Sequence, residues 1–323
     1  LMMLAATHSP GTPLSEALDL SDTVLEIGLT PNRPDCLCHL GVAREIAAME
    51  NTPLKRPKIE LPPATGHITE LASVSVENPE FCPRYAARMV INVRVTPSPE
   101  WLQRRLRAVG LKPINNIVDI TNYVMMETGQ PLHAFDFDRL EEHRVVVRTP
   151  AGEDFFTTLD GKARKLADDT VLICDSRKPV AIGGVMGGEN SEITDSTDRV
   201  LIESACFDPV SIRKTAKMLG IGTDASHRFE RGVDREGTLY ALYRGAQLMT
   251  ELSGGTLVEG TIDEHPRPPE RKVIRLSVAQ ANRHLGTRLT SQEIRDLLVS
   301  IEFSASPSGD DALEVTPPSF RVD

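Results

Sequence analysis

The sequence predicts a multidomain α+β protein in which a central mixed domain of short β-strands packed with helices precedes a winged-helix-like module. The chain has 323 residues, which is more than one hydrophobic core usually serves. Between residues 70 and 262, short strand-like runs alternate with runs of helical period. Proline-rich stretches without periodicity, at 51–66 and 263–272, separate this block from its neighbours. We therefore expect units at 1–65, 70–262 and 270–323.

Composition excludes some classes of function. The chain is 40% hydrophobic and 25% charged, which is typical of a folded globular protein. Its net charge of -10 argues against a protein that coats nucleic acid with a basic face, although a local basic patch stays compatible with it. Aromatic residues make up only 4% of the chain and leave few platforms for stacking single-stranded bases.

The cysteines indicate a reducing, cytoplasmic compartment, because their number is odd and their spacing irregular; they are Cys36, Cys38, Cys82, Cys174 and Cys206. The run "CLCH" at 36–39 has zinc-ligand residue types. No second pair follows at ligand spacing, so buried apolar roles are favoured over zinc. No apolar run reaches the roughly 18 residues of a membrane span, and we expect no membrane association.

The N-terminal unit contains one expected strand and one expected helix. Apolar residues alternate over 22–30, as in a half-buried strand. Over 36–50 they recur at helical spacing.

The central block opens with a strand over 85–95, whose odd positions are apolar and predict one buried face. A helix follows, with Ser98 placed to cap it and Gly110 placed to end it. Arginines occupy its polar face at positions 104, 105 and 107. Two interpretations remain: a solvated face, or contact with a phosphate backbone.

The remaining elements follow in order. We expect a helix over 115–127 and a long helix over 235–252, stopped by two glycines. Between them lie short strands at 144–148, 169–175 and 199–207, and a hairpin that turns at Asp160–Gly161. In the last unit, Ser277 caps a helix to 285. Thr290 and Glu293 form the capping box of a helix to 301, and a strand covers 312–323.

Several polar or glycine-rich features could bind a ligand. Four glycines interrupt the apolar stretch 179–190, where they suit either a bulged turn or close approach of a ligand to the main chain. The polar run 219–234 suits either a solvated loop or a network around a ligand. Glu203 lies in a strand pattern, where alternation favours an outward side chain and a buried one would be a strong acceptor.

The remaining polar residues that could bind a ligand are His133, Thr121 and Asn122. No Ser-His-Asp or Cys-His order stands out, and no paired carboxylates do. The residues by themselves therefore predict an α+β domain with a polar ligand pocket, and leave its chemistry unassigned.

Four long segments closely resemble the β subunit of bacterial phenylalanyl-tRNA synthetase: "TPNRPDCLCHLGVAREIAAME", "NNIVDITNYVMMETGQPLHAFD", the run from "AIGGVMGGEN" to "RFERGVD", and "PPSFRVD". They occur in the family's order and span nearly the whole chain. By the resemblance, we expect this sequence to lack the family's N-terminal tRNA-binding OB domain and the part that follows the start of the winged-helix-like module.

The resemblance implies that the central block is an editing domain, which hydrolyses tyrosine wrongly attached to tRNA(Phe). A pocket shaped for phenylalanine rejects an added hydroxyl by only roughly a hundredfold, so a second site that requires the hydroxyl improves selection. By the resemblance, Glu203 reads the tyrosine hydroxyl from a buried position. The implied catalytic set is His133, Glu203 and Thr223, and the implied substrate-binding set is Thr121, Asn122, Gly184, Gly187 and Ala225.

The resemblance also implies that water attacks the ester, with His133 positioning the substrate, and that Asp224, Arg228, Glu230 and Arg231 form ion pairs around the pocket. The intact enzyme would use ATP and Mg²⁺ to attach phenylalanine to tRNA(Phe), as a heterotetramer of two α and two β subunits in the cytoplasm. Asp323 matches the first of the family's metal-binding acidic residues.

Two other classes of function remain as alternatives. The chain would be a non-catalytic scaffold that docks tRNA or the α subunit if the pocket were inert. A DNA-binding regulator rests on the winged-helix pattern alone, and the acidic balance counts against DNA as a partner.

Overall fold

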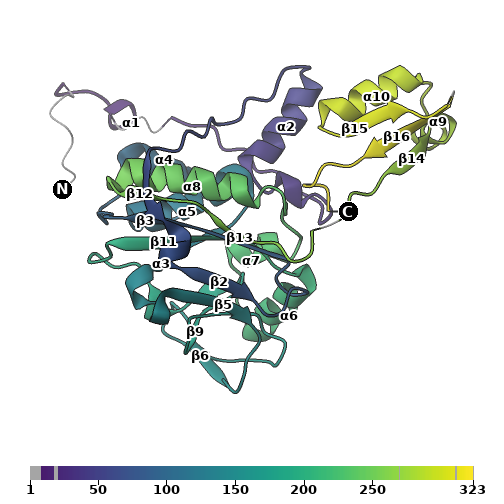
Figure 1. The fold of residues 1–323 in the computed structure, drawn as a ribbon. Helices are drawn as coiled ribbons and strands as arrows, with labels where there is room; N and C mark the ends of the chain where they lie inside the picture. Colours follow the sequence, from purple (N-terminus) through teal and green to yellow (C-terminus); the bar gives the residue numbers. More distant parts are fainter. Residues whose placement is uncertain (1–8, 18–20, 269, 310, 323) are drawn as a thin grey trace.

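The computed structural model describes residues 9–17, 21–268, 270–309 and 311–322. Most of them form a central body in which two β-sheets pack together, while a small C-terminal module projects from one side (Figure 1). This arrangement confirms the α+β class predicted from the sequence.

The first sheet has the strand order β1-β12-β3-β11-β4, and β13 also pairs with β3. The bounds of its strands are Ala64–His67 (β1), Arg84–Ile91 (β3), Leu132–Asp136 (β4), Arg199–Cys206 (β11), Thr256–Glu259 (β12) and Ile262–Glu264 (β13). Strands β3 and β11 pair antiparallel over their whole lengths, and β4 pairs antiparallel with the other edge of β11.

The second sheet has the order β10-β9-β8-β5-β2. Its strands are Ser73–Val76 (β2), Arg144–Arg148 (β5), Leu172–Cys174 (β8), Pro179–Ile182 (β9) and Met186–Gly187 (β10). A two-stranded hairpin of Phe155–Thr157 (β6) and Ala163–Lys165 (β7) lies beyond it, and turns through Asp160 and Gly161 as predicted.

Both faces of the first sheet are covered, so the expectation that only one face of the 85–95 strand is buried was wrong. Even-numbered β3 residues such as Ala86 and Val90 pack into a core with the helices α4, α5 and α8. Odd-numbered residues such as Tyr85 and Met89 pack against the second sheet. Alternation indicates one buried face only where the other face meets water.

The three covering helices are Glu100–Ala108 (α4), Asn116–Thr128 (α5) and Thr238–Ser253 (α8). Asn115 caps α5, and Gly129 ends it in the left-handed region at φ 84°. Ser98 does not cap α4, contrary to expectation. Pro99 takes the N-cap position instead, and the Ser98 hydroxyl donates to the buried carboxylate of Asp119 at 2.6 Å.

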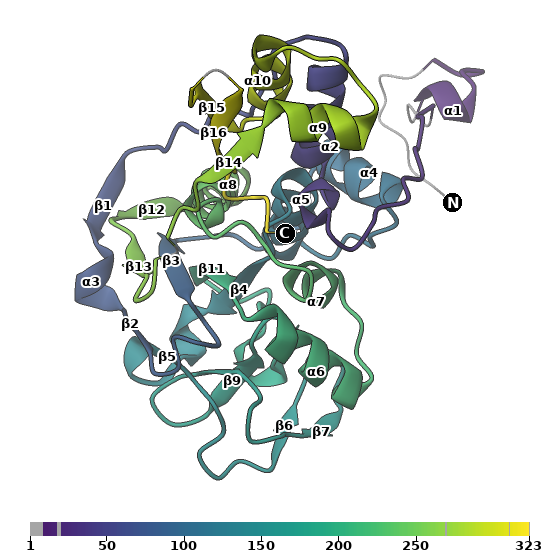
Figure 2. The ribbon, with the colours of Figure 1, turned by 90° about the vertical axis from the view of Figure 1, so that its right-hand side faces the viewer.

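Two helices lie on the side of the body that faces the viewer in Figure 2. They are Pro209–Leu219 (α6) and Asp224–Phe229 (α7), and they pack side by side. Short helical segments complete the body: Ile68–Leu71 (α3), Phe137–Arg139 (η2), Glu141–His143 (η3) and Glu189–Ser191 (η4).

The N-terminal region has Leu14–Ala17 (α1), a 3-10 turn at Pro34–Cys36 (η1) and His39–Met49 (α2), which confirms the expected helix. The strand expected over 22–30 is wrong, since that segment has no regular structure and its Val24 and Leu25 side chains are both 69% exposed. No described strand lies beside it to accept its backbone hydrogen bonds, and alternation alone does not form a strand.

The C-terminal module contains Val278–Leu285 (α9) and Ser291–Ser300 (α10), packed on a sheet of Ile274–Ser277 (β14), Ser304–Pro307 (β15) and Ala312–Thr316 (β16). Ser277 and the Thr290–Glu293 capping box begin the helices as predicted. The last strand ends at Thr316 because two prolines follow, so the expectation of a strand to 323 was wrong. None of the described helices has the length and apolar character needed to cross a membrane.

Candidate functional site

A cavity of about 550 Å³ opens between the first sheet, helix α5, the turn that joins β9 to β10, and the start of α7. Every residue assigned to the pocket from the sequence lines this cavity: Thr121, Asn122, His133, Gly184, Gly187, Glu203, Thr223 and Ala225. Their proximity is therefore a property of the fold, whereas their roles stay predictions.

Glu203 lies on β11, the strand at the centre of the cavity floor. Its side chain is 7% exposed, so the outward orientation favoured by strand alternation is wrong. The phenol of Tyr85, diagonally across on β3, donates a hydrogen bond of 2.8 Å to Oε2 of Glu203. Burial raises the pKa of Glu203 to about 7, and the Tyr85 hydrogen bond opposes that shift. Oε1 of Glu203 accepts no hydrogen bond from the described residues.

His133 is directly opposite Glu203 in the β4–β11 ladder, and the two side chains therefore emerge on the same face of the sheet. Its ring contacts Phe135 edge-on at a centroid distance of 4.5 Å. Neither ring nitrogen has a hydrogen-bond partner within the described ranges. Burial lowers the pKa of His133 to about 4, so the imidazole is neutral at pH 7 and offers one donor and one acceptor to the cavity.

The glycines form the wall that faces this histidine. A Cβ at Gly187 would lie 2.7 Å from Cε1 of His133, closer than atoms can approach without displacement. Gly184 adopts φ 67°, a conformation that side chains disfavour, and a Cβ there would meet Ile212 and Phe207 at 2.9 Å each. The glycine stretch is thus both a tight turn and a surface that leaves room for the ring of His133.

The hydroxyl groups of two threonines in the cavity wall already donate hydrogen bonds within the protein. Thr121 donates to the carbonyl of Val118 at 2.7 Å, within α5. Thr223 donates to the carbonyl of Val185 at 3.1 Å and accepts from the Ser226 amide as the N-cap of α7. Each hydroxyl can therefore accept a further hydrogen bond from a ligand, but neither is arranged as a nucleophile.

Helix α7 is held in place by a buried arginine. Arg228, which is 6% exposed, donates from Nε and Nη2 to the Leu37 carbonyl and pairs with Asp224 at 3.1 Å. Arg231 pairs with Glu230 at 2.5 Å nearer the surface. The polar run 219–234 is therefore a cavity wall braced by ion pairs, and one brace reaches the N-terminal segment.

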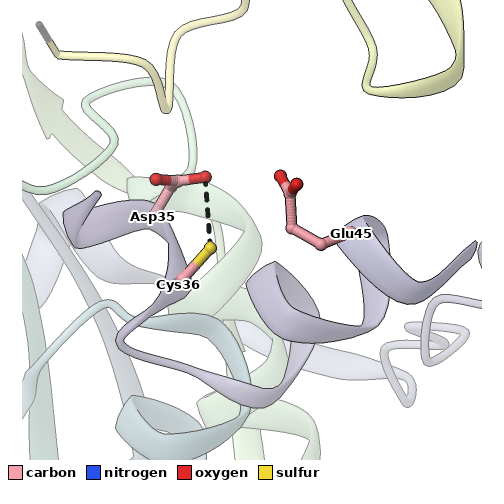
Figure 3. A group of neighbouring side chains, drawn as sticks. All are labelled: Asp35, Cys36 and Glu45. Carbon is pink, nitrogen blue, oxygen red and sulfur yellow. Dashed lines mark hydrogen bonds between the residues drawn. The ribbon is translucent and has the colours of Figure 1, made fainter. Parts of the chain in front are cut away.

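A second cluster has the residue types of a metal site, namely Asp35, Cys36 and Glu45 (Figure 3). Nη2 of Arg33 lies 2.9 Å from Asp35, 3.0 Å from the Cys36 sulfur and 2.6 Å from Glu45. A guanidinium thus already occupies the place where these groups converge. Burial raises the pKa of Cys36 to about 11, which keeps it a thiol, a poor metal ligand.

The other residues of the "CLCH" run also have protein partners. The Cys38 sulfur accepts from the Gly41 amide as the N-cap of α2, and Nδ1 of His39 lies 2.9 Å from the Met126 carbonyl oxygen. Asp323, expected to bind metal in the whole enzyme, lies outside the described residues.

Sequence reasoning missed the partner of the carboxylate and the rim of the cavity. Tyr85 looked like one more inward apolar residue, because nothing local indicates which group its hydroxyl meets. Ile114 and Leu159 line the cavity although they are 66% and 41% exposed, and exposed aliphatic residues at a cavity mouth carry no distinctive spacing.

Comparison with known proteins assigns two segments to families. Residues 81–254 match the model of the B3/4 domain, and residues 274–323 match that of the tRNA synthetase B5 domain. The first segment holds all of the cavity residues, and the second coincides with the C-terminal module.

Similar proteins carry one name. Three are called "Phenylalanine--tRNA ligase beta subunit", from Syntrophus aciditrophicus, Salinibacter ruber and Geobacter sulfurreducens, with identities of 51%, 49% and 48%. The matches cover 100% of this chain and 40%, 39% and 40% of those proteins. The chain thus spans about two fifths of the length of these curated relatives, and the resemblance found in its motifs is confirmed.

Proposed function

Because the chain belongs to the B3/4 domain family, we propose that it is the editing part of a phenylalanine–tRNA ligase β subunit. The reaction we assign to it is hydrolysis of the ester that joins tyrosine to tRNA(Phe). The observation that carries this proposal is the position of Glu203, a carboxylate on the floor of a largely apolar cavity with one oxygen unpartnered among the described residues.

This carboxylate supplies selection for a phenol. A tyrosine ring entering between the glycine turn and helix α5 would donate its hydroxyl to Oε1 of Glu203. Phenylalanine would leave that oxygen without a partner in a desolvated place, which costs about 1 to 3 kcal/mol. Since about 1.4 kcal/mol corresponds to a factor of ten, the expected preference for tyrosine is roughly 5- to 150-fold.

Water is the nucleophile that the lining supports. Among the described residues of the cavity wall there is no cysteine, serine or lysine, and both threonine hydroxyls donate to backbone carbonyls. A histidine with a pKa of about 4 is a weak base at pH 7. We therefore assign His133 the role of orienting the ester or the attacking water through hydrogen bonds. Thr223 and Asn122 would accept or donate bonds to the amino acid and ribose.

The properties of the whole enzyme belong to the same proposal. The complete β subunit would join an α subunit in a cytoplasmic heterotetramer that binds tRNA(Phe) and uses ATP and Mg²⁺ to attach phenylalanine. In that assembly this chain would contribute correction of errors, and the ligation site would lie elsewhere.

Deacylation of two charged tRNAs tests the proposal. The full chain is incubated with tRNA(Phe) carrying labelled tyrosine or labelled phenylalanine, and release of each amino acid is followed against the uncatalysed rate. We expect selective release of tyrosine. Equal release of both amino acids would refute the selection by Glu203, and release of neither would favour a scaffold that only docks tRNA.

A further inference from the structure

We propose that helix α6 and the groove between α6 and α7 bind the phosphate backbone of the RNA that carries the ester to the cavity. This inference rests on the proposed function, because it names the surface by which the substrate of that site is held.

Helix α6 concentrates unpaired positive charge in an acidic protein. The chain carries a net charge of -10, yet α6 contains Arg213, Lys214 and Lys217 and no acidic residue. All three side chains are exposed, and none forms an ion pair or hydrogen bond with a described residue. Several other arginines of the central body are paired with carboxylates, as Arg84 is with Asp263 and Arg244 with Glu127.

A groove of about 290 Å³ lies beside these cations. Arg213 and Lys217 line it from α6, His227 lines it from α7 and Glu230 from the C-cap of α7, and Gly222 lies between the two helices. The negative charge of Glu230 is neutralised by Arg231. The groove is therefore an exposed, net positive hollow of a kind that suits phosphate groups.

The groove and the cavity lie on either side of the segment 222–226. Gly222 and Ser226 line the groove, while Thr223 and Ala225, within the same five residues, line the cavity. Figure 2 shows α6 and α7 side by side at this position. A strand of RNA lying along α6 would thus hold its terminal ester within reach of the cavity without crossing the body of the protein.

Two of the α4 arginines, which the sequence left open as phosphate contacts, are hydrogen-bonded to side chains of α4 and α5. Arg105 donates to the Tyr123 hydroxyl and lies over the Trp101 ring, and Arg107 donates to Gln103. Of the two basic helices, α6 is the one that lines a groove beside the cavity and whose cations form no hydrogen bond with a described residue.

The test compares charge-removing substitutions on the two helices. The full chain, the double variant Arg213→Gln/Lys217→Gln and the control Arg107→Gln are titrated with uncharged tRNA(Phe) by fluorescence anisotropy over a range of salt concentrations. Each lost phosphate contact should reduce the slope of log Kd against log[salt] by about 0.7 to 0.9. We expect the double variant to bind more weakly at low salt, with a slope reduced by roughly 1.5, and the control to match the parent chain.

Deacylation kinetics complete the test. For tyrosine-charged tRNA(Phe), we expect the double variant to raise KM with kcat unchanged, because binding is altered and the cavity is not. Identical titrations for the parent and the double variant would overturn the inference, as would absence of RNA binding by the parent. Absence of tyrosine release from every protein, with the binding difference intact, would refute the editing function while leaving the RNA surface standing.

Discussion

The phenolic oxygen of Tyr85 lies 2.8 Å from Oε2 of Glu203, on neighbouring strands of the first sheet. Both side chains are buried between the two sheets, so the bond gives the Tyr85 hydroxyl and Oε2 of Glu203 a hydrogen-bond partner that each would otherwise lack. The bond also restrains the carboxylate of Glu203, which lines the cavity and whose other oxygen has no partner among the described residues. Under the proposed function, selection of a hydroxyl by Glu203 would therefore depend on Tyr85, which does not line the cavity.

Tyr85→Phe should weaken selection without changing the cavity wall. Loss of the donor raises the pKa of Glu203 above about 7, because this hydrogen bond lowers it at present. We expect the ratio of tyrosine to phenylalanine release to fall several-fold at pH 7 and to recover at higher pH, where Glu203 ionises. A pH profile of that ratio measures both effects. A uniformly lower rate with an unchanged ratio would show that Tyr85 only supports the fold.

Glu203→Gln should change how stability depends on pH. The pKa of Glu203 rises from 4.5 unfolded to about 7 folded, so its favourable contribution is complete below pH 4.5 and is lost as the pH rises to about 7. The uncharged amide that replaces the carboxylate would carry no such dependence, and its oxygen could still accept from Tyr85.

The difference in unfolding free energy, variant minus parent, should therefore increase between pH 5 and pH 8 by up to about 3 kcal/mol. Urea unfolding at several pH values measures it. His133 contributes the opposite trend, since its stabilisation is lost as the pH falls from 6.5 to about 4, but that trend is common to both proteins and cancels. A difference that stays constant across this pH range would contradict burial of an ionisable Glu203.

Gly187→Ala and Gly184→Ala should fail in different ways. The added methyl at Gly187 collides with His133, so the expected result is slower tyrosine release with little change in stability. The methyl at Gly184 meets Ile212 and Phe207 from a left-handed backbone, and should lower the unfolding free energy by about 1 to 3 kcal/mol. Thermal unfolding and deacylation rates of the two variants separate these outcomes. Equal loss of stability in both would argue against a specific role for the space beside His133.

Arg228→Gln should loosen the wall of the cavity that α7 forms. The substitution removes bonds to the Leu37 carbonyl and to Asp224 from a buried position, at an expected cost of about 1.5 to 3 kcal/mol. Amide hydrogen exchange in α7 should become faster, and tyrosine release slower.

Arg231→Gln is the matched control, because its partly exposed pair with Glu230 should contribute at most about 1 kcal/mol. Unaltered exchange in α7 of the Arg228 variant would show that the N-terminal segment does not brace the cavity.

The local elements could be predicted where the signals are local. Ser277 and the Thr290–Glu293 pair are caps that act within one helical turn, and the helices begin there as predicted. The strand expected over 22–30 failed because a strand needs a partner, which its own sequence does not specify. Ser98 is not the cap of α4, because Pro99 holds the N-cap position, and its hydroxyl bonds to Asp119, 21 residues away, which the local sequence does not indicate.

The site shows the same division. The cavity residues could be predicted from the family resemblance. The alternation of residues in one strand predicted that Glu203 points outward, because the sequence of one strand does not indicate that the sheet is covered on both faces. Tyr85 as the partner of Glu203 follows only from the β3–β11 register. Arg228 and Leu37 are 191 positions apart, and their contact depends on how α7 and the N-terminal segment come together.

The most direct test of the central claim is the ratio of kcat/KM for tyrosine-charged and phenylalanine-charged tRNA(Phe), measured for the parent chain and for Glu203→Ala. We predict that the parent prefers the tyrosine ester by roughly 5- to 150-fold. In Glu203→Ala, this ratio should fall by about tenfold or more if the parent preference is large, and to close to one if it is small. A variant that keeps the full preference for tyrosine would contradict the assignment of Glu203 as the group that recognises the hydroxyl.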